Sequence, residues 1–387
     1  MKFLLKINDK IKPLFAKGGK LEKLEPLFEA GDAFTFTSPA VTDKGTHVRD
    51  AADMKRIMVT VIYAVLPCFF FGVWNAGHQY NLANIGASTG FIADILRGLF
   101  IVMPIVIVSY GVGGFWEVMF ACIKKHEINE GLLVTGLLFP LILPPTIPLW
   151  QVAVGISFGV VIGKEIFGGT GMNIVNPALM SRAFLFFAYS QYMVGDVWIA
   201  LKSGGELVDG VTTATPLGIL LDMPKDATAV NMLSNAGYTF KSMLIGNMPG
   251  SIGETSAIAC LIGAVILLIT GVGSWRIMLS CVIGLLGTGL LFNLTGNSTI
   301  PPHYHLVMGG FAFGAFFMAT DPVSAAATNI GKWIYGFMIG MLIVIIRVAN
   351  PAFPEGVMLS ILFMNIVAPL IDHYVVAAHI RRRTIHG

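Results

Sequence analysis

The sequence predicts an all-α polytopic membrane protein with about ten transmembrane helices in two pseudo-repeated halves. Composition gives the first reason, because 55% of the residues are apolar, only 12% are charged and the mean hydropathy is +0.76. Soluble domains carry roughly 25% charged residues, so this chain could not cover a soluble surface. Long apolar runs give a second reason. A weak sequence similarity between the two halves, here called the internal echo, gives a third.

The apolar runs are long enough to cross a bilayer core, which needs about 20 residues per helix. The third run contains Pro140, Pro144, Pro145 and Pro148, so we expect it to be broken or re-entrant, with protein satisfying its backbone. The expected spans are residues 56–75, 97–121, 131–148, 150–168, 176–191, 255–273, 276–295, 304–320, 332–349 and 355–376.

Basic residues set the expected orientation, because they accumulate on the cytoplasmic side. Residues 1–55 form an expected cytoplasmic arm before a transmembrane domain over 56–387. Lys124, Arg182 and the basic tail 381–383 fall at expected inner ends, and Arg347 falls near an outer end. The polar interval 191–254, with six acids and three lysines, is expected outside, in the periplasm. Both termini are then cytoplasmic.

The internal echo consists of two Pro-containing turns. Asn176-Pro177 and Asp321-Pro322 each follow a Gly- and Phe-rich span, one in each half. Each could begin a helix, with Pro in the first turn after an Asn or Asp cap. Two halves of about five helices would form an internally duplicated, transporter-like core.

The common catalytic and nucleotide-binding motifs of soluble enzymes are not apparent in the sequence. We find no Walker A loop, dinucleotide-binding glycine fingerprint, HExxH or Ser-His-Asp arrangement. None of the four cysteines has CxxC spacing, so we expect no thioredoxin-like chemistry and no four-cysteine zinc site. We expect no metal site within this chain, and a pair of cysteines could contribute only to a site that partner subunits complete. The cysteines are Cys68, Cys122, Cys260 and Cys281.

Two intramembrane acids, Glu117 and Asp372, are candidates for function because buried charges are costly in a bilayer. Each is also compatible with a charge at a helix end whose side chain reaches water. Both fall toward the expected cytoplasmic side, where two carboxylates would suit entry of a small hard cation.

Two further segments could contact a flat ring. The glycine-rich turn 168–173 is either a tight interhelical turn or a site that holds Asn173 and Asn176 against a polar ring. The aromatic run 184–189 either faces lipid or forms an apolar wall for a quinone or flavin. Gly113-Gly114 would let a ligand approach the backbone closely.

The segment Asp209-Gly210-Val211-Thr212-Thr213-Ala214-Thr215 lies in the expected periplasmic interval. Its small residues are typical of a turn with local Ser/Thr hydrogen bonds. They also leave the Thr215 hydroxyl accessible to a large ligand or enzyme.

Taken in order, the motifs resemble a known family. They include Gly113-Gly114-Phe115-Trp116-Glu117 and Met318-Ala319-Thr320-Asp321-Pro322. The others are residues 47–50, 55–56, 74–77, 125–131, 164–171, 176–179, 182–189, 246–254 and 350–356. The set closely resembles the B-subunit family of the sodium-pumping NADH:quinone oxidoreductases of bacterial inner membranes, over nearly the whole chain.

That resemblance implies a covalent cofactor. In this family a flavin transferase joins the phosphate of FMN to the last threonine of a motif, which here is Thr215. Asp209, Thr212 and Ala214 occupy matching positions. Thr213 stands where Gly is usual and Pro216 follows the acceptor, as in the related D subunit of the Rnf complex.

The resemblance also implies the remaining ligands. Noncovalent riboflavin is expected at Asn173 and Asn176, and sodium uptake at Glu117 and Asp372. Ubiquinone is expected at Gly113, Gly114, Phe184 and Phe186. The family works as a six-subunit complex among membrane lipids, with no nucleic acid. Because no NADH site occurs here, the chain would not be active alone.

Two alternatives are compatible with the sequence. One is the equivalent subunit of an Rnf-type ferredoxin:NAD oxidoreductase, which shares the flavin threonine. The other, from a different class, is a passive solute channel. A channel would give no reason for the segment that ends at Thr215.

Overall fold

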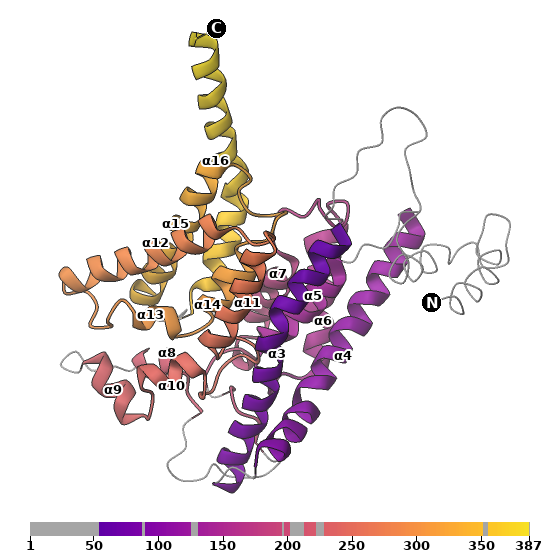
Figure 1. Cartoon of the computed structure of the whole chain (residues 1–387). Coiled ribbons are helices and arrows are strands. Elements are labelled where there is room, and N and C mark those ends of the chain that lie inside the picture. Colours follow the sequence, from indigo (N-terminus) through magenta and orange to yellow (C-terminus); the bar gives the residue numbers. More distant parts are fainter. Residues whose placement is uncertain are drawn as a thin grey trace, which may run out of the picture.

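Over the residues that it describes, the structure consists of helices and connections (Figure 1). This computed structural model describes residues 54–86, 90–124, 131–195, 197–201, 213–221, 228–350 and 355–386. The expected cytoplasmic arm therefore lies almost wholly outside the described residues, as do Asp209 and Thr212.

The prediction of an all-α polytopic membrane protein is confirmed. Five described helices are long and apolar enough to cross a membrane, and three shorter ones are apolar. The long ones are α3 (Met54–Ile85), α4 (Phe91–Lys124), α12 (Trp275–Leu294), α15 (Asn329–Ala349) and α16 (Val357–His386). The shorter ones are α5 (Gly131–Leu141), α7 (Pro177–Ala188) and α11 (Ala257–Ile269).

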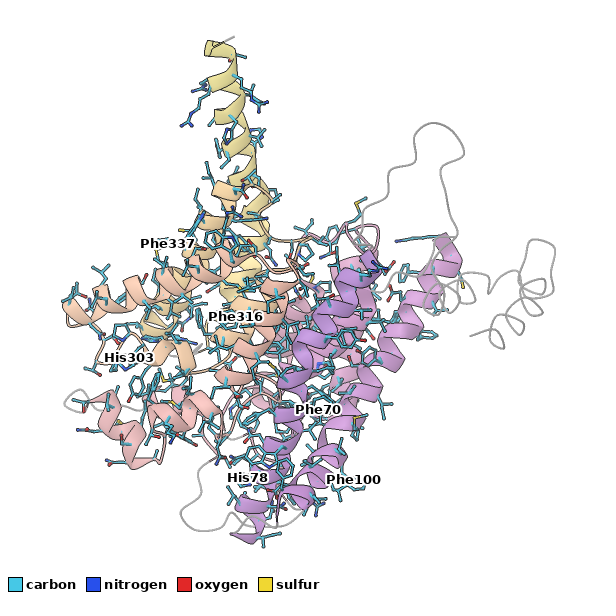
Figure 2. All side chains as sticks on the ribbon, viewed as in Figure 1. Phe70, His78, Phe100, His303, Phe316 and Phe337 are labelled. Carbon is cyan, nitrogen blue, oxygen red and sulfur yellow. The ribbon has the colours of Figure 1, made fainter. Side chains whose placement is uncertain are left out.

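Large apolar side chains cover the outer surface of the bundle. On α3 and α4, Phe70 is 64% exposed and Phe100 is 78% exposed (Figure 2). A soluble monomer rarely exposes extensive apolar patches, whereas lipid solvates them well. This surface is consistent with a location within a bilayer.

The third expected span is broken, as its prolines predict. Helix α5 ends at Leu141, and the chain continues irregularly to α6 (Leu149–Val160). The segment before α11 lies against this break, and the Ile252 and Gly253 N–H groups donate to the Leu143 and Leu141 carbonyls at 3.1 and 2.7 Å. Irregular backbone at membrane depth requires such partners.

The expected span over 304–320 is not one helix. It divides into α13 (Tyr304–Val307), α14 (Phe311–Phe313) and the π-helix η4 (Gly314–Met318). Arg347 of α15 donates to the carbonyls of His305 and Met308, each at 2.9 Å, and so stabilises the break between α13 and α14. Arg347 is buried, so its place near an outer end reflects packing.

The two halves contain related pieces. In the first half, α6 continues into the π-helix η2 (Val161–Glu165), and Asn176-Pro177 then begins α7. In the second half, η4 is followed by Asp321-Pro322. The sequence echo therefore corresponds to a recurring order, a π-helix and then an Asx-Pro turn. Such π-helical segments are frequent at functional sites.

Glycines let the long helices pack closely within each half (Figure 1). A Cβ on Gly98 of α4 would lie 1.7 Å from the Val73 carbonyl oxygen of α3. In the second half, a Cβ on Gly340 of α15 would lie 2.1 Å from the Cys281 carbonyl oxygen of α12. Small residues at helix crossings are the usual basis of packing in membranes.

Three short helices follow the first half: α8 (Pro216–Leu221), α9 (Ala229–Asn235) and α10 (Phe240–Ile245). They lie on the side of the body where α3 ends and α4 begins, opposite the C-terminal end of α16 (Figure 1). The described helices α8–α10 and the C-terminal end of α16 therefore lie on opposite sides of the body.

Candidate functional site

Thr215 lies at the start of α8, where its side chain is half-buried. Its Oγ1 accepts a hydrogen bond from the Gly218 N–H at 3.1 Å, and Pro216 occupies the first helical turn. The Tyr238 hydroxyl donates to the Ala214 carbonyl at 3.1 Å, and burial raises the pKa of Tyr238, which therefore stays protonated as a donor. Thr215 is thus fixed by contacts on both sides.

A cavity of about 290 Å³, here called the Thr215 cavity, opens beside this residue. Its walls include Phe186 of α7, Met193, Trp198 and Met358. Aromatic and methionine side chains suit a flat, apolar ring system. Glu355 also lines this cavity. Thr215, Glu355 and Glu254 line a second, smaller cavity of about 20 Å³.

A charged cluster lies beside the two cavities. Arg182 of α7 contacts Glu254 at 3.3 Å and Glu355 at 2.5 Å, and only 5% of its side chain is exposed. Burial raises the pKa of Glu254 to about 7, because desolvation outweighs the attraction of Arg182. The expectation that Arg182 lies at an inner helix end is wrong, because it lies within α7 and pairs across the two halves.

The cluster is tightly enclosed. A Cβ on Gly310 would lie 2.5 Å from Glu254 Oε1, so this position has no room for a larger residue. Arg347 approaches from the other side and donates to the Glu355 carbonyl at 3.3 Å. Two carboxylates and two guanidinium groups are therefore fixed near Thr215 by elements of both halves.

A third cavity, of about 70 Å³, lies between the two halves and is here called the inter-half cavity. Asn173 and Asn176 line it from the first half, beside Lys164, and Asp321 and Phe317 line it from the second. The two Asx-Pro turns of the sequence echo thus face one cavity, and the structure brings the two candidate riboflavin residues together there.

The asparagines also have structural roles. The Asn176 side chain accepts from the N–H groups of Ala178 and Leu179 at 3.0 and 3.3 Å and so caps α7. Asn173 donates to the Val175 carbonyl at 3.1 Å. The capping interaction is a sufficient structural reason for Asn176, whereas the single bond of Asn173 leaves it more available to a ligand.

The two candidate sodium residues lie apart. Glu117 pairs with Lys164 at 2.6 Å, and the two side chains are 2% and 3% exposed. Asp372 accepts from the Ala327 and Thr328 N–H groups at 2.7 and 3.0 Å, immediately before α15. Within the described residues, no group of three His, Cys, Asp or Glu side chains could hold a metal ion.

The candidate quinone residues have different neighbours in the described part of the chain. Gly113 of α4 faces Leu132 of α5 and Ile156 of α6. Phe184 stacks on Phe158 with ring centroids 4.4 Å apart, and Phe186 lines the Thr215 cavity.

Sequence reasoning missed the buried acids Glu254 and Asp94 and the half-buried acid Glu355. Asp94 lies at the start of α4, where it pairs with His78 at 2.9 Å and is 1% exposed. Glu254 follows Pro249, Gly250 and Gly253 in the sequence, Glu355 follows Pro351 and Pro354, and each acid precedes an apolar helix. An acid between helix-breaking residues and a span is a signal that could have identified both.

Comparison with known proteins decides the family. Residues 41–381 match the sequence model of the NQR2, RnfD, RnfE family. The chain belongs to this family. Three of its curated relatives come from Ectopseudomonas mendocina (52% identical), Stutzerimonas stutzeri (51%) and Chromohalobacter salexigens (49%). Each of the three is named as the B subunit of a Na(+)-translocating NADH-quinone reductase, and the alignments cover 97% of this chain and 97%, 97% and 94% of the relatives.

Proposed function

We propose that this chain is the membrane-embedded B subunit of a sodium-translocating NADH:ubiquinone oxidoreductase and that it carries FMN on Thr215. The observation that carries the proposal is the position of Thr215 at the edge of an apolar and aromatic cavity, in a chain about half identical to relatives of that name. The cavity volume, about 290 Å³, is near the roughly 300 Å³ at which ligand pockets begin.

The residues present fit the cofactor. A phosphoester bond at Thr215 Oγ, with loss of water, would tether a group whose ring can enter the Thr215 cavity between Phe186, Trp198 and Met358. The flavin supplies one-electron chemistry, and the protein sets its position and electrostatics. Thr215 already has its backbone fixed by α8 and Tyr238, so the tether has a defined origin.

The other ligands are proposed from the family resemblance. Noncovalent riboflavin is assigned to Asn173 and Asn176 beside the inter-half cavity, which at about 70 Å³ would have to widen to admit the ring system. Ubiquinone belongs near Gly113, Gly114, Phe184 and Phe186. Sodium belongs at Glu117 and Asp372, with carboxylate oxygens as ligands.

The proposal includes a location and partners. The chain is a multi-pass protein of the bacterial inner membrane, with both termini cytoplasmic and Thr215 periplasmic, where a flavin transferase modifies it. It works within a six-subunit complex. Relatives named as quinone reductases favour this reading over the Rnf-type subunit, although the family includes both.

In-gel fluorescence of the denatured subunit tests the proposal. We expect a fluorescent band for the unsubstituted chain and none for Thr215→Ala. The matched control is Thr239→Ala, because Thr239 caps α10 through the Ser242 N–H at 3.2 Å much as Thr215 caps α8. A fluorescent band that persists in Thr215→Ala would exclude the assigned acceptor.

Sodium-stimulated ubiquinone reduction by the assembled complex then separates the pump from the alternatives. An Rnf-type complex would reduce NAD with ferredoxin, and a passive channel would carry no flavin.

A further inference from the structure

Among the described residues, Glu355 is the one charged side chain that lines the Thr215 cavity. About a third of this side chain, 31%, is exposed, whereas its partner Arg182 is 5% exposed. Glu355 therefore lines the cavity, whereas the guanidinium that it binds does not. Glu254 contacts the same guanidinium from the far side and lines only the smaller cavity.

In this geometry the negative and positive charges lie at different distances from the cavity. The carboxylate of Glu355 is nearest, and Arg182, which it shares with Glu254, is further away. Arg347 directs its guanidinium to backbone carbonyls, including that of Glu355. Because charges interact strongly where water is scarce, these groups act on whatever occupies the cavity.

We propose that the Arg182–Glu355 pair sets the reduction potential of the flavin on Thr215, with Glu254 holding Arg182 in position. The inference rests on the proposed function, because it requires a flavin at Thr215. A carboxylate beside the ring opposes the negative charge added by an electron, and the arginine behind it favours that charge.

The sign of each effect follows from the arrangement. Glu355→Gln removes the nearest negative charge, so the flavin should become easier to reduce and its potential should rise. Glu355→Asp keeps the charge and should restore the potential toward its original value. Glu254→Gln should have a smaller effect, because Glu254 acts through Arg182 and does not line the Thr215 cavity.

The matched control is Asp94→Asn. Asp94 is also a buried acid, and it pairs with His78 on α3. Asp94 does not line the Thr215 cavity, so neutralising it should leave the flavin potential unchanged. A general loosening of the fold would affect both variants, whereas a local electrostatic effect would appear only in Glu355→Gln.

The test is a redox titration of the assembled complex at fixed pH, followed by flavin absorbance. Subtracting the titration of Thr215→Ala isolates the flavin on Thr215. We expect Glu355→Gln to change the oxidised-to-reduced ratio at a given applied potential at least tenfold, about 59 mV for a one-electron couple.

The outcomes separate the two proposals. Absence of fluorescence on Thr215 in the unsubstituted chain overturns the proposed function. Fluorescence with an unchanged potential in Glu355→Gln overturns this inference alone, as does an equal shift in Asp94→Asn. If Glu355→Gln does not assemble, the potential is measured in Arg182→Lys instead. Lysine is shorter than arginine and carries a compact charge, so this variant should also move the potential, and an unchanged potential would overturn the inference.

Discussion

The buried pair of Glu117 and Lys164 offers a prediction with a definite magnitude. Their Nζ–Oε1 distance is 2.6 Å and both side chains are at least 97% buried, being 2% and 3% exposed. Lys164→Met would leave the Glu117 carboxylate buried beside an apolar side chain. Removing one partner of such a pair typically costs about 3–5 kcal/mol, because the remaining charge keeps its desolvation penalty. We therefore expect the free energy of unfolding to fall by about that amount.

Two further variants isolate the pair. Lys124→Met removes a lysine that is 35% exposed and lies 3.6 Å from Glu165, which is 1% exposed; because water already reaches this lysine, the cost should be smaller than that of Lys164→Met. The double variant Glu117→Gln with Lys164→Met leaves no unpaired charge and should recover most of the loss. Denaturant unfolding of the purified subunit in detergent measures all three.

The same substitution has a functional consequence. If Glu117 binds sodium, Lys164 competes with the ion for the carboxylate. Lys164→Met should then lower the sodium concentration that half-activates ubiquinone reduction. The reasoning is refuted if Lys164→Met is as stable as the unsubstituted chain, or if the double variant is no more stable than the single one.

Three other substitutions have expected outcomes. Gly98→Ala should prevent close packing of α4 on α3, because its Cβ would lie 1.7 Å from a backbone oxygen. Gly111→Ala on the same helix meets open space and should stabilise the protein by up to about 1 kcal/mol. Thermal unfolding in detergent compares the two variants. Asp372→Asn should raise the sodium requirement of quinone reduction with little loss of stability. Asp372→Ala should also lower the free energy of unfolding by about 1–2 kcal/mol, because it removes the hydrogen bonds before α15. If both variants respond to sodium like the unsubstituted chain, Asp372 is not a sodium ligand. Asn176→Ala should lower the free energy of unfolding by about 1 kcal/mol, because it removes the N-cap of α7. It should also lower the riboflavin content of the complex, which extraction and chromatography measure. An unchanged riboflavin content would exclude a contact at Asn176.

Apolar length predicts the regular part of this fold well. The expected spans 276–295 and 332–349 correspond closely to α12 and α15. Helix α3 extends ten residues beyond its expected end at 75, to Ile85, because its polar side chains find partners inside the protein. Asn75 donates to the Met248 carbonyl at 3.0 Å, and Gln79 donates to Asn247 at 2.8 Å. A hydropathy count cannot anticipate such tertiary partners.

The site is less accessible to sequence reasoning. The break within 304–320 depends on Arg347, which is 39 and 42 residues away from the carbonyls that it binds. Arg182 meets Glu254 and Glu355 at separations of 72 and 173 residues. Its neighbours along the chain do not indicate these contacts. The placement of Asn173 and Asn176 opposite Asp321 is indicated in the sequence only by the paired Asx-Pro turns.

The measurement that tests the central claim most directly is the mass of the tryptic peptide that contains Thr215. Cleavage after Lys202 and Lys225 gives residues 203–225. We predict that this peptide, prepared from the native membrane complex, is heavier by one FMN minus water and that fragmentation places the added mass on Thr215. An unmodified peptide, or a modification on Thr212 or Thr213, would contradict the assignment of Thr215 as the flavin carrier.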